Sequence, residues 1–152
     1  MVDWWWASMW FCLWLLSETG VRIFRVEPIV RTDDDKWLGF GGLTDDDLKT
    51  CFNARTEFTA EDIAVGADLW NAYRRGDNAK LAEFSTSTSA CFPYLKEICE
   101  AAIEKDTRPA EIIAEIQFEG KTEFEDIFSE FTRRVGIYGF GDTQVKRLMQ
   151  KI

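Results

Sequence analysis

The segment DWWWASMWFCLWLL, residues 3–16, constrains the fold of this chain more than any other part of its sequence. It predicts a helix over residues 3–17, which begins at the N-cap residue Asp3 and ends at the polar residues after Leu16. The apolar side chains go round the whole cylinder and leave no polar face, and a helix of this kind is normally buried. The run is too short for the roughly 20 residues that cross a bilayer, and it lacks the basic start and the cleavage site of a signal peptide.

Residues 21–26, VRIFRV, alternate apolar and charged side chains as a β-strand does. A helix, a glycine and a short strand form the repeating step of an α/β sheet, and one strand cannot form a sheet alone. We therefore expect residues 1–30 to be the last helix-strand step of an incomplete α/β unit whose sheet lies before Met1. Without that sheet, the helix is expected to bind a protein partner or to self-associate. The side chains expected to do so are Trp4, Trp5, Trp6, Trp10 and Trp14, with ligand stacking and membrane contact as the alternatives.

Start signals of helices recur along the rest of the chain. Thr44, Thr59 and Thr122 are each followed by an acidic residue three positions later, the pattern of a capping box. Asp142 follows the glycine-rich turn at residues 136–141 and is predicted to cap the last helix. Helices are predicted over residues 44–52, 63–74, 79–84, 92–104, 109–117, 122–134 and 143–152.

These elements predict a mainly helical chain of the α+β class. The remnant of an α/β domain at residues 1–30 is followed by a linker at 31–43. A helical domain is expected over residues 44–106, and a three-helix, helix-turn-helix-like module over 107–152.

The middle of the chain resembles a bacterial group, the proteins of the domain of unknown function 1835 with its companion C-terminal domain 3658. The shared pattern is Leu-Gly, then Leu-Thr before an acidic helix start, an Arg, a Thr-initiated helix with Trp-x-x-Tyr-Arg, an Asp turn, a Leu and a Pro-x-Leu. In this chain these places are held by Leu38-Gly39, Leu43-Thr44, Leu48, Arg55, Thr59, Trp70, Tyr73-Arg74, Asp77, Leu81 and Pro93-x-Leu95.

The resemblance covers residues 36–104 best, and two features of the group are absent from this chain. Its members have a longer N-terminal α/β half with a Gly-Asp-Ser-like loop, and many have a histidine after the Pro-x-Leu helix. The group has no established activity, so the resemblance implies a fold and leaves the function open.

Composition excludes several kinds of site. The net charge of −9 argues against a chain that binds nucleic acid over its whole surface, and the absence of histidine removes Ser-His-Asp, Cys-His and histidine-metal sites. The four cysteines, at 12, 51, 91 and 99, form no C-x-x-C pair and are interpreted as buried, reduced thiols of a cytoplasmic protein. The acidic residues 33–35 do not fit a calcium loop, and the glycines at 39–42 do not fit a phosphate loop. No cofactor or metal is predicted.

One helix-face cluster could bind a ligand. Trp70, Tyr73 and Arg74 share a face at i, i+3 and i+4, and aromatic and arginine side chains together can stack on bases or sugars. Core packing with Arg74 at the rim is the commoner outcome of such a pattern.

The C-terminal twenty residues hold five basic residues against one acidic residue, a net +4, which leaves −13 on residues 1–132. The order of helix, capped helix, turn and basic helix is that of a DNA-binding helix-turn-helix. Against this, the turn is long and the preceding helix is acidic. The candidate nucleic-acid contacts are Arg133, Arg134, Gln144, Lys146, Arg147 and Lys151.

Together these observations favour a non-enzymatic binding or regulatory module that self-associates. Two alternatives stay open. One is a DNA-binding regulator that acts through residues 133–152, and the other is a fragment of an enzyme whose active site lies in an absent N-terminal half.

Overall fold

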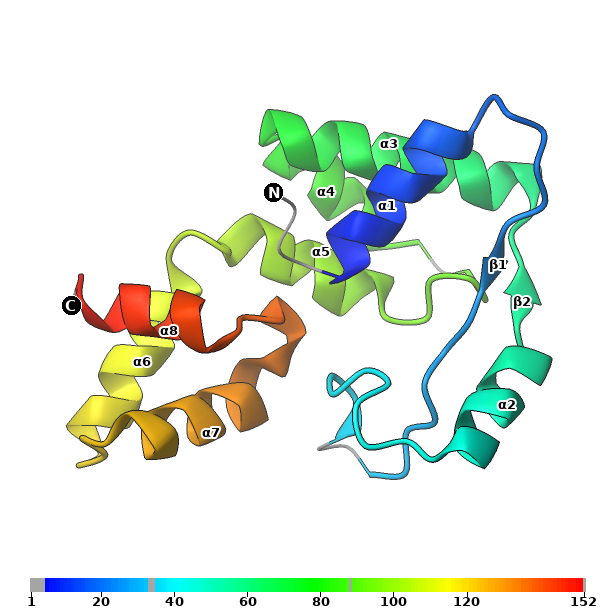
Figure 1. Cartoon of the computed structure of the whole chain (residues 1–152). Coiled ribbons are helices and arrows are strands. Elements are labelled where there is room, and N and C mark those ends of the chain that lie inside the picture. Colours follow the sequence, from blue (N-terminus) through cyan, green and yellow to red (C-terminus); the bar gives the residue numbers. More distant parts are fainter. Residues whose placement is uncertain (1–4, 33–34, 88, 152) are drawn as a thin grey trace.

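The computed structural model describes residues 5–32, 35–87 and 89–151, without the side chain of Trp5 (Figure 1). The described part is mainly helical, as the sequence predicts, with a single two-stranded sheet. The elements are α1 (Trp5–Leu16), β1 (Phe24–Arg25), α2 (Asp45–Asn53), β2 (Thr56–Glu57), α3 (Ala60–Arg75), α4 (Asn78–Phe84), α5 (Leu95–Glu104), α6 (Arg108–Phe118), α7 (Phe124–Val135), the 3-10 turn η2 (Gly136–Tyr138) and α8 (Asp142–Met149). The expected N-cap Asp3 and the residues Trp4, Asp33 and Asp34 lie outside the described part.

Helix α1 is buried against α3 of the same chain rather than against a sheet. Gly66 of α3 lies so close to α1 that a Cβ atom built on it would stand 2.3 Å from Leu13 Cδ1. A glycine at the crossing point lets the two backbones approach, and α1 crosses in front of α3 in Figure 1. The expectation that this helix needs a sheet as its partner is therefore corrected.

Strand β1 also finds its partner within the chain. Phe24 pairs with Glu57 and Arg25 with Thr56 in an antiparallel ladder, and Phe58 N donates to Ile23 O at 3.0 Å. An α/β step would place the neighbouring strand parallel to β1. Within the described residues, the helix and strand at residues 5–25 are thus joined to α3 and β2.

Two of the three predicted capping boxes form. Thr44 and Thr59 each accept from the backbone N–H three residues later, and the acidic side chains at 47 and 62 accept in return. Thr122 forms no box, because α7 begins one residue later, after Glu123, and has no side-chain cap. Helix α8 begins after Gly141, whose N–H donates to Gln144 Oε1 at 3.0 Å, so Asp142 is the first helical residue rather than the cap.

The C-terminal helices α6, α7 and α8 pack on one another at the end of the molecule opposite β1, β2 and α2 (Figure 1). Their shared core contains the fully buried side chains Ile113, Ile116, Ile127, Phe131 and Val145. This module is tied to the N-terminal helix by a hydrogen bond from Trp6 Nε1 to Ile137 O, 3.0 Å long.

In the part of the chain that the structure describes, no helix combines the length and the apolar character needed to cross a membrane.

Candidate functional site

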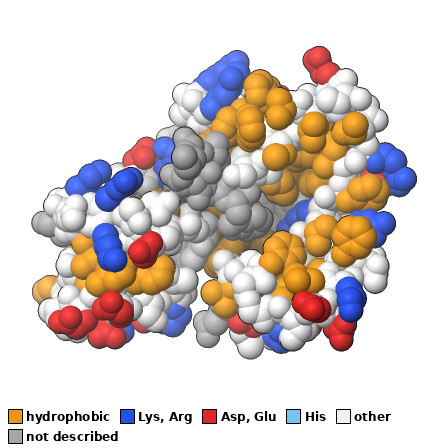
Figure 2. All heavy atoms as spheres, in the orientation of Figure 1, with side chains coloured by type: hydrophobic (Ala, Val, Ile, Leu, Met, Phe, Trp, Pro, Cys, Tyr) orange, Lys and Arg blue, Asp and Glu red, His pale blue; other side chains and the backbone are white. Residues whose placement is uncertain are grey.

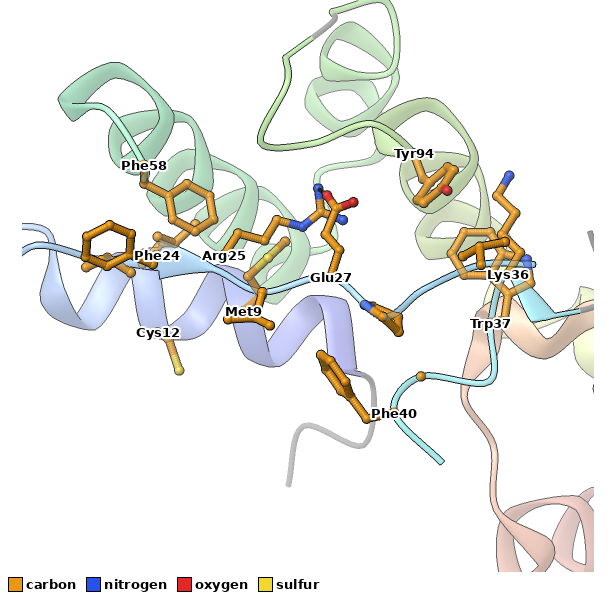
Figure 3. Close-up of a pocket in the computed structure, with 16 residues that line it drawn as sticks. Met9, Cys12, Phe24, Arg25, Glu27, Lys36, Trp37, Phe40, Phe58 and Tyr94 are labelled. Atoms are coloured by element: carbon orange, nitrogen blue, oxygen red, sulfur yellow. Dashed lines mark ion pairs between the residues drawn. The ribbon is translucent and has the colours of Figure 1, made fainter. Parts of the chain in front are cut away.

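An apolar pocket of about 340 Å³ lies beside α1 (Figure 3). Its walls come from five parts of the chain: α1, the β1 segment with residues 26–30, residues 36–40, Phe58 and Tyr94. Phe24 and Phe58 lie toward one end of the pocket, Trp37 and Tyr94 toward the other, and Met9, Arg25 and Glu27 between them.

The segment at residues 36–40 forms the outer wall and is held by Trp37. The indole packs edge-on to Tyr94 with ring centroids 5.4 Å apart. A Cβ atom on Gly136 would stand 3.1 Å from Trp37 Cβ, so this side chain is also wedged against the start of η2. Beyond Trp37 the segment turns through glycines, and Phe40, which is 45% exposed, stands at the edge of the pocket.

Each cation of the pocket is already neutralised by a group of the chain. The Arg25 side chain is only 9% exposed, forms an ion pair with Glu27, and donates from Nη1 to Cys91 O at 3.0 Å. Burial lowers the pKa of Arg25, and the Glu27 carboxylate partly offsets that shift.

Lys36 is bound in a similar way. Its Nζ donates to Glu97 Oε1 at 2.8 Å and lies 4.3 Å from the Tyr94 ring centroid and 4.9 Å from that of Trp37. Two aromatic faces and a carboxylate around one ammonium hold Lys36 in place. The apolar pocket therefore contains two positively charged side chains, and each of them already has a counterion from the chain.

The cysteines differ in position. Cys51, Cys91 and Cys99 are buried free thiols, and burial raises the pKa of Cys91 to about 11 and that of Cys99 to about 12. Cys12 is exposed and lines the pocket, which corrects the interpretation of all four as buried. Within residues 5–32, 35–87 and 89–151, no group of three or more Cys, Asp or Glu side chains could hold a metal ion.

The predicted aromatic cluster is divided between core and surface. Tyr73 packs edge-on to Trp6 and Trp10, with ring centroids 5.6 and 6.2 Å apart. Trp70 is half-buried, and Arg74 is exposed over the ring of Trp14. This arrangement is core packing with Arg74 at the rim.

Two of the tryptophans expected to meet a partner are buried instead. Trp6 and Trp10 are 0% and 1% exposed, because α3 covers their side of α1. In this conformation neither can contact a partner, which corrects that expectation for both residues. Trp14 is half-buried at the surface, whereas Trp4 and the side chain of Trp5 lie outside the described residues.

Four of the six candidate nucleic-acid contacts in the tail are engaged within the tail itself. Arg133 binds Glu130, and Arg134 bridges Glu130 and Glu119. Gln144 accepts from Gly141 N–H, and Lys146 Nζ lies 4.3 Å from the Phe124 ring centroid. Arg147 and Lys151 are exposed. These contacts supply no specific observation in favour of a DNA interface.

Acidification is expected to break the ion-pair network around Glu130. Hydrogen bonds from Arg133 and Arg134 lower the pKa of Glu130 from 4.5 to about 2. Because the pKa is lower in the folded chain, the network stabilises it fully above pH 4.5, and this contribution is lost as the pH falls toward 2. An NMR titration of the Glu130 carboxyl carbon should show a midpoint near 2. A midpoint at the ordinary glutamate value would contradict the network, and Glu130→Gln should flatten the acid limb of the melting-temperature profile.

Sequence reasoning missed the pocket. Its lining residues have no common spacing, and at residues 39–42 the sequence shows only that the glycines do not fit a phosphate loop. Comparison of the chain with protein-family models, curated proteins and solved structures finds no significant match. The family resemblance stays a prediction from the residues that carry it.

Proposed function

We propose that this chain is a binding module whose pocket receives a neutral, apolar ligand. The observation that carries the proposal is the pocket of about 340 Å³ built from five parts of the chain, with aromatic rings at both ends. A mostly apolar hollow with a few convergent polar groups is typical of small-molecule sites, which range over roughly 300–1,000 Å³. The size is suited to one ring system or a short aliphatic chain.

The charges of the pocket support a neutral ligand. Arg25 and Lys36 are already paired with Glu27 and Glu97, so a ligand carboxylate would have to displace a carboxylate of the chain. A ligand carboxylate would also be repelled by the Glu27 or Glu97 carboxylate that already lies beside the cation. A neutral apolar group needs no such displacement and gains the free energy of removing its surface from water.

Filling the pocket is expected to abolish binding. Val26→Trp would place a large ring among the lining residues, and the affinity for the neutral fluorescent probe N-phenyl-1-naphthylamine should fall by at least about tenfold. The matched control is Val21→Trp, because Val21 is 51% exposed and does not line the pocket.

A second measurement uses the thiol at the pocket. Bound probe should slow the alkylation of Cys12 by a maleimide in the unmodified chain and in Val21→Trp, with no protection in Val26→Trp. Unchanged probe affinity in a folded Val26→Trp variant would show that the ligand lies elsewhere.

We further propose that the chain belongs with the bacterial domain 1835 and 3658 group, acts in the cytoplasm and has a regulatory rather than a catalytic role. Support for the family comes from Thr44 and Thr59, motif positions that cap α2 and α3, and from Asp77, which caps α4. The cytoplasm is proposed because the three buried thiols of this chain are free, which is compatible with a reducing compartment. A set of related sequences in which these positions vary freely would overturn the family assignment.

A further inference from the structure

A second surface, separate from the pocket, lies on the outer side of the crossing between α1 and α3. We call it the α1–α3 face and define it by Phe11, Trp14, Leu15 and Trp70. The ring centroids of Phe11 and Trp70 are 5.2 Å apart, those of Phe11 and Trp14 are 5.8 Å apart, and Leu15 is 56% exposed. None of the four lines the pocket. In Figure 2 hydrophobic side chains gather over α1, and basic side chains border them.

The edge of this face is positively charged, although the chain as a whole carries −9. The guanidinium of Arg74 lies 5.4 Å from the ring centroid of Trp14, and Arg75 follows it at the exposed end of α3. No carboxylate of the described residues forms an ion pair with either arginine, whereas many other cations of the chain are paired. Helix α1 contributes no charged side chain from Trp5 to Leu16.

We infer that the α1–α3 face is a docking site for an acidic amphipathic helix of another protein. Aromatic side chains with arginine at the rim are typical of a binding hot spot. A helix with apolar residues at i, i+3, i+4 and i+7 would lay that stripe across Phe11, Trp14 and Trp70. Its flanking carboxylates would pair with Arg74 and Arg75.

The charge at the edge favours this occupant over a second copy of the chain. Two copies facing each other through the α1–α3 face would bring two sets of Arg74 and Arg75 to the edge of one interface, where like charges oppose association. It also favours a peptide over an anionic bilayer. An anionic bilayer extends beyond the face and is repelled by the acidic remainder of the chain. A peptide covers only the face, and charges more than ~8–10 Å away are largely screened at physiological salt.

The test uses a designed probe helix of about 18 residues, about 27 Å long. It has leucines at i, i+3, i+4 and i+7, glutamates on both flanks and a terminal fluorescein. Anisotropy titrations with the full chain should show saturable binding that weakens as salt is added. The matched peptide with lysine in place of every glutamate should bind at least about tenfold more weakly.

Substitutions separate the two parts of the face. Arg74→Glu with Arg75→Glu should weaken binding of the acidic peptide by about tenfold and reduce the preference over the lysine peptide. Trp14→Ser with Leu15→Ser should weaken both peptides by about thirtyfold. Lys96→Glu is the control, because Lys96 lies on α5, outside the α1–α3 face, and its side chain is 70% exposed. This substitution should leave peptide binding unchanged.

Three results would overturn the inference. Equal affinity for the glutamate and lysine peptides would remove the role of charge. Flotation with phosphatidylserine vesicles, together with no peptide binding, would identify a membrane surface. A dimer in light scattering that Trp14→Ser converts to a monomer would identify a second copy. Val26→Trp changes only the pocket, and the substitutions at Trp14, Leu15, Arg74 and Arg75 change only the α1–α3 face, so this test and that of the proposed ligand fail independently.

Discussion

Gly66→Ala is expected to destabilise the folded chain by about 2 kcal/mol, although alanine favours a helix by roughly 1 kcal/mol over glycine. The reason is the crossing of α1 and α3. An added Cβ atom would stand 2.3 Å from Leu13 Cδ1 and 2.9 Å from Leu13 Cβ, and the second of these atoms cannot move without the backbone of α1. The free energy of unfolding from urea titrations followed by circular dichroism measures the effect.

The clash can be assigned to its partner by a double-mutant cycle. Leu13→Ala alone should destabilise through the cavity it leaves, but in the Gly66→Ala background it should also relieve the clash. The loss of unfolding free energy in the double variant is therefore expected to be smaller than the sum of the two single losses by about 1 kcal/mol or more. Gly41→Ala is the control, because its nearest contact would be 3.8 Å away, and it should not destabilise. Additive effects of the two single changes would show that α1 and α3 do not meet at these residues.

Trp10→Ala is expected to destabilise the folded chain by about 3–5 kcal/mol. The Trp10 side chain is 1% exposed, its ring lies 4.8 Å from that of Trp6, and Tyr73 packs against both rings. Removing it would leave a large cavity between the two helices. The midpoint of guanidinium unfolding should fall while the slope of the transition is unchanged.

Trp14→Ala on the same helix provides the comparison. Trp14 is half-buried on the outer side of α1, so its truncation should cost about 1 kcal/mol or less. A large difference between the two variants is expected because α3 covers only one side of α1. Equal costs would mean that both tryptophans are buried, and they would contradict the α1–α3 face as well as the packing.

Local signals in the sequence predicted most helices closely. The Thr44 and Thr59 boxes form where expected, since a capping side chain and the backbone N–H that donates to it lie within four residues of each other. At Thr122 the same pattern gave no box, because α7 begins after Glu123. A local pattern permits a cap, but the packing of the helix decides at which residue the helix begins.

The candidate site could not be predicted in the same way. Its lining joins α1, β1, residues 36–40 and Tyr94, and no spacing along the chain records that these segments meet. The partner of the first helix was beyond sequence reasoning for the same reason. The all-apolar surface of that helix indicated burial correctly, but it contained nothing to distinguish a sheet from α3.

The sequence by itself determined that this chain is mainly helical, where most of its helices begin and that its first helix packs against another part of a protein. These properties depend on interactions within a few residues, such as caps and turns, and on the need to remove apolar surface from water. Only the tertiary structure decided that Gly66 admits α1, that Trp6 and Trp10 face inward while Trp14 faces outward, and that five parts of the chain line a pocket. These outcomes depend on contacts between residues far apart in the chain, whose geometry is fixed when the helices pack.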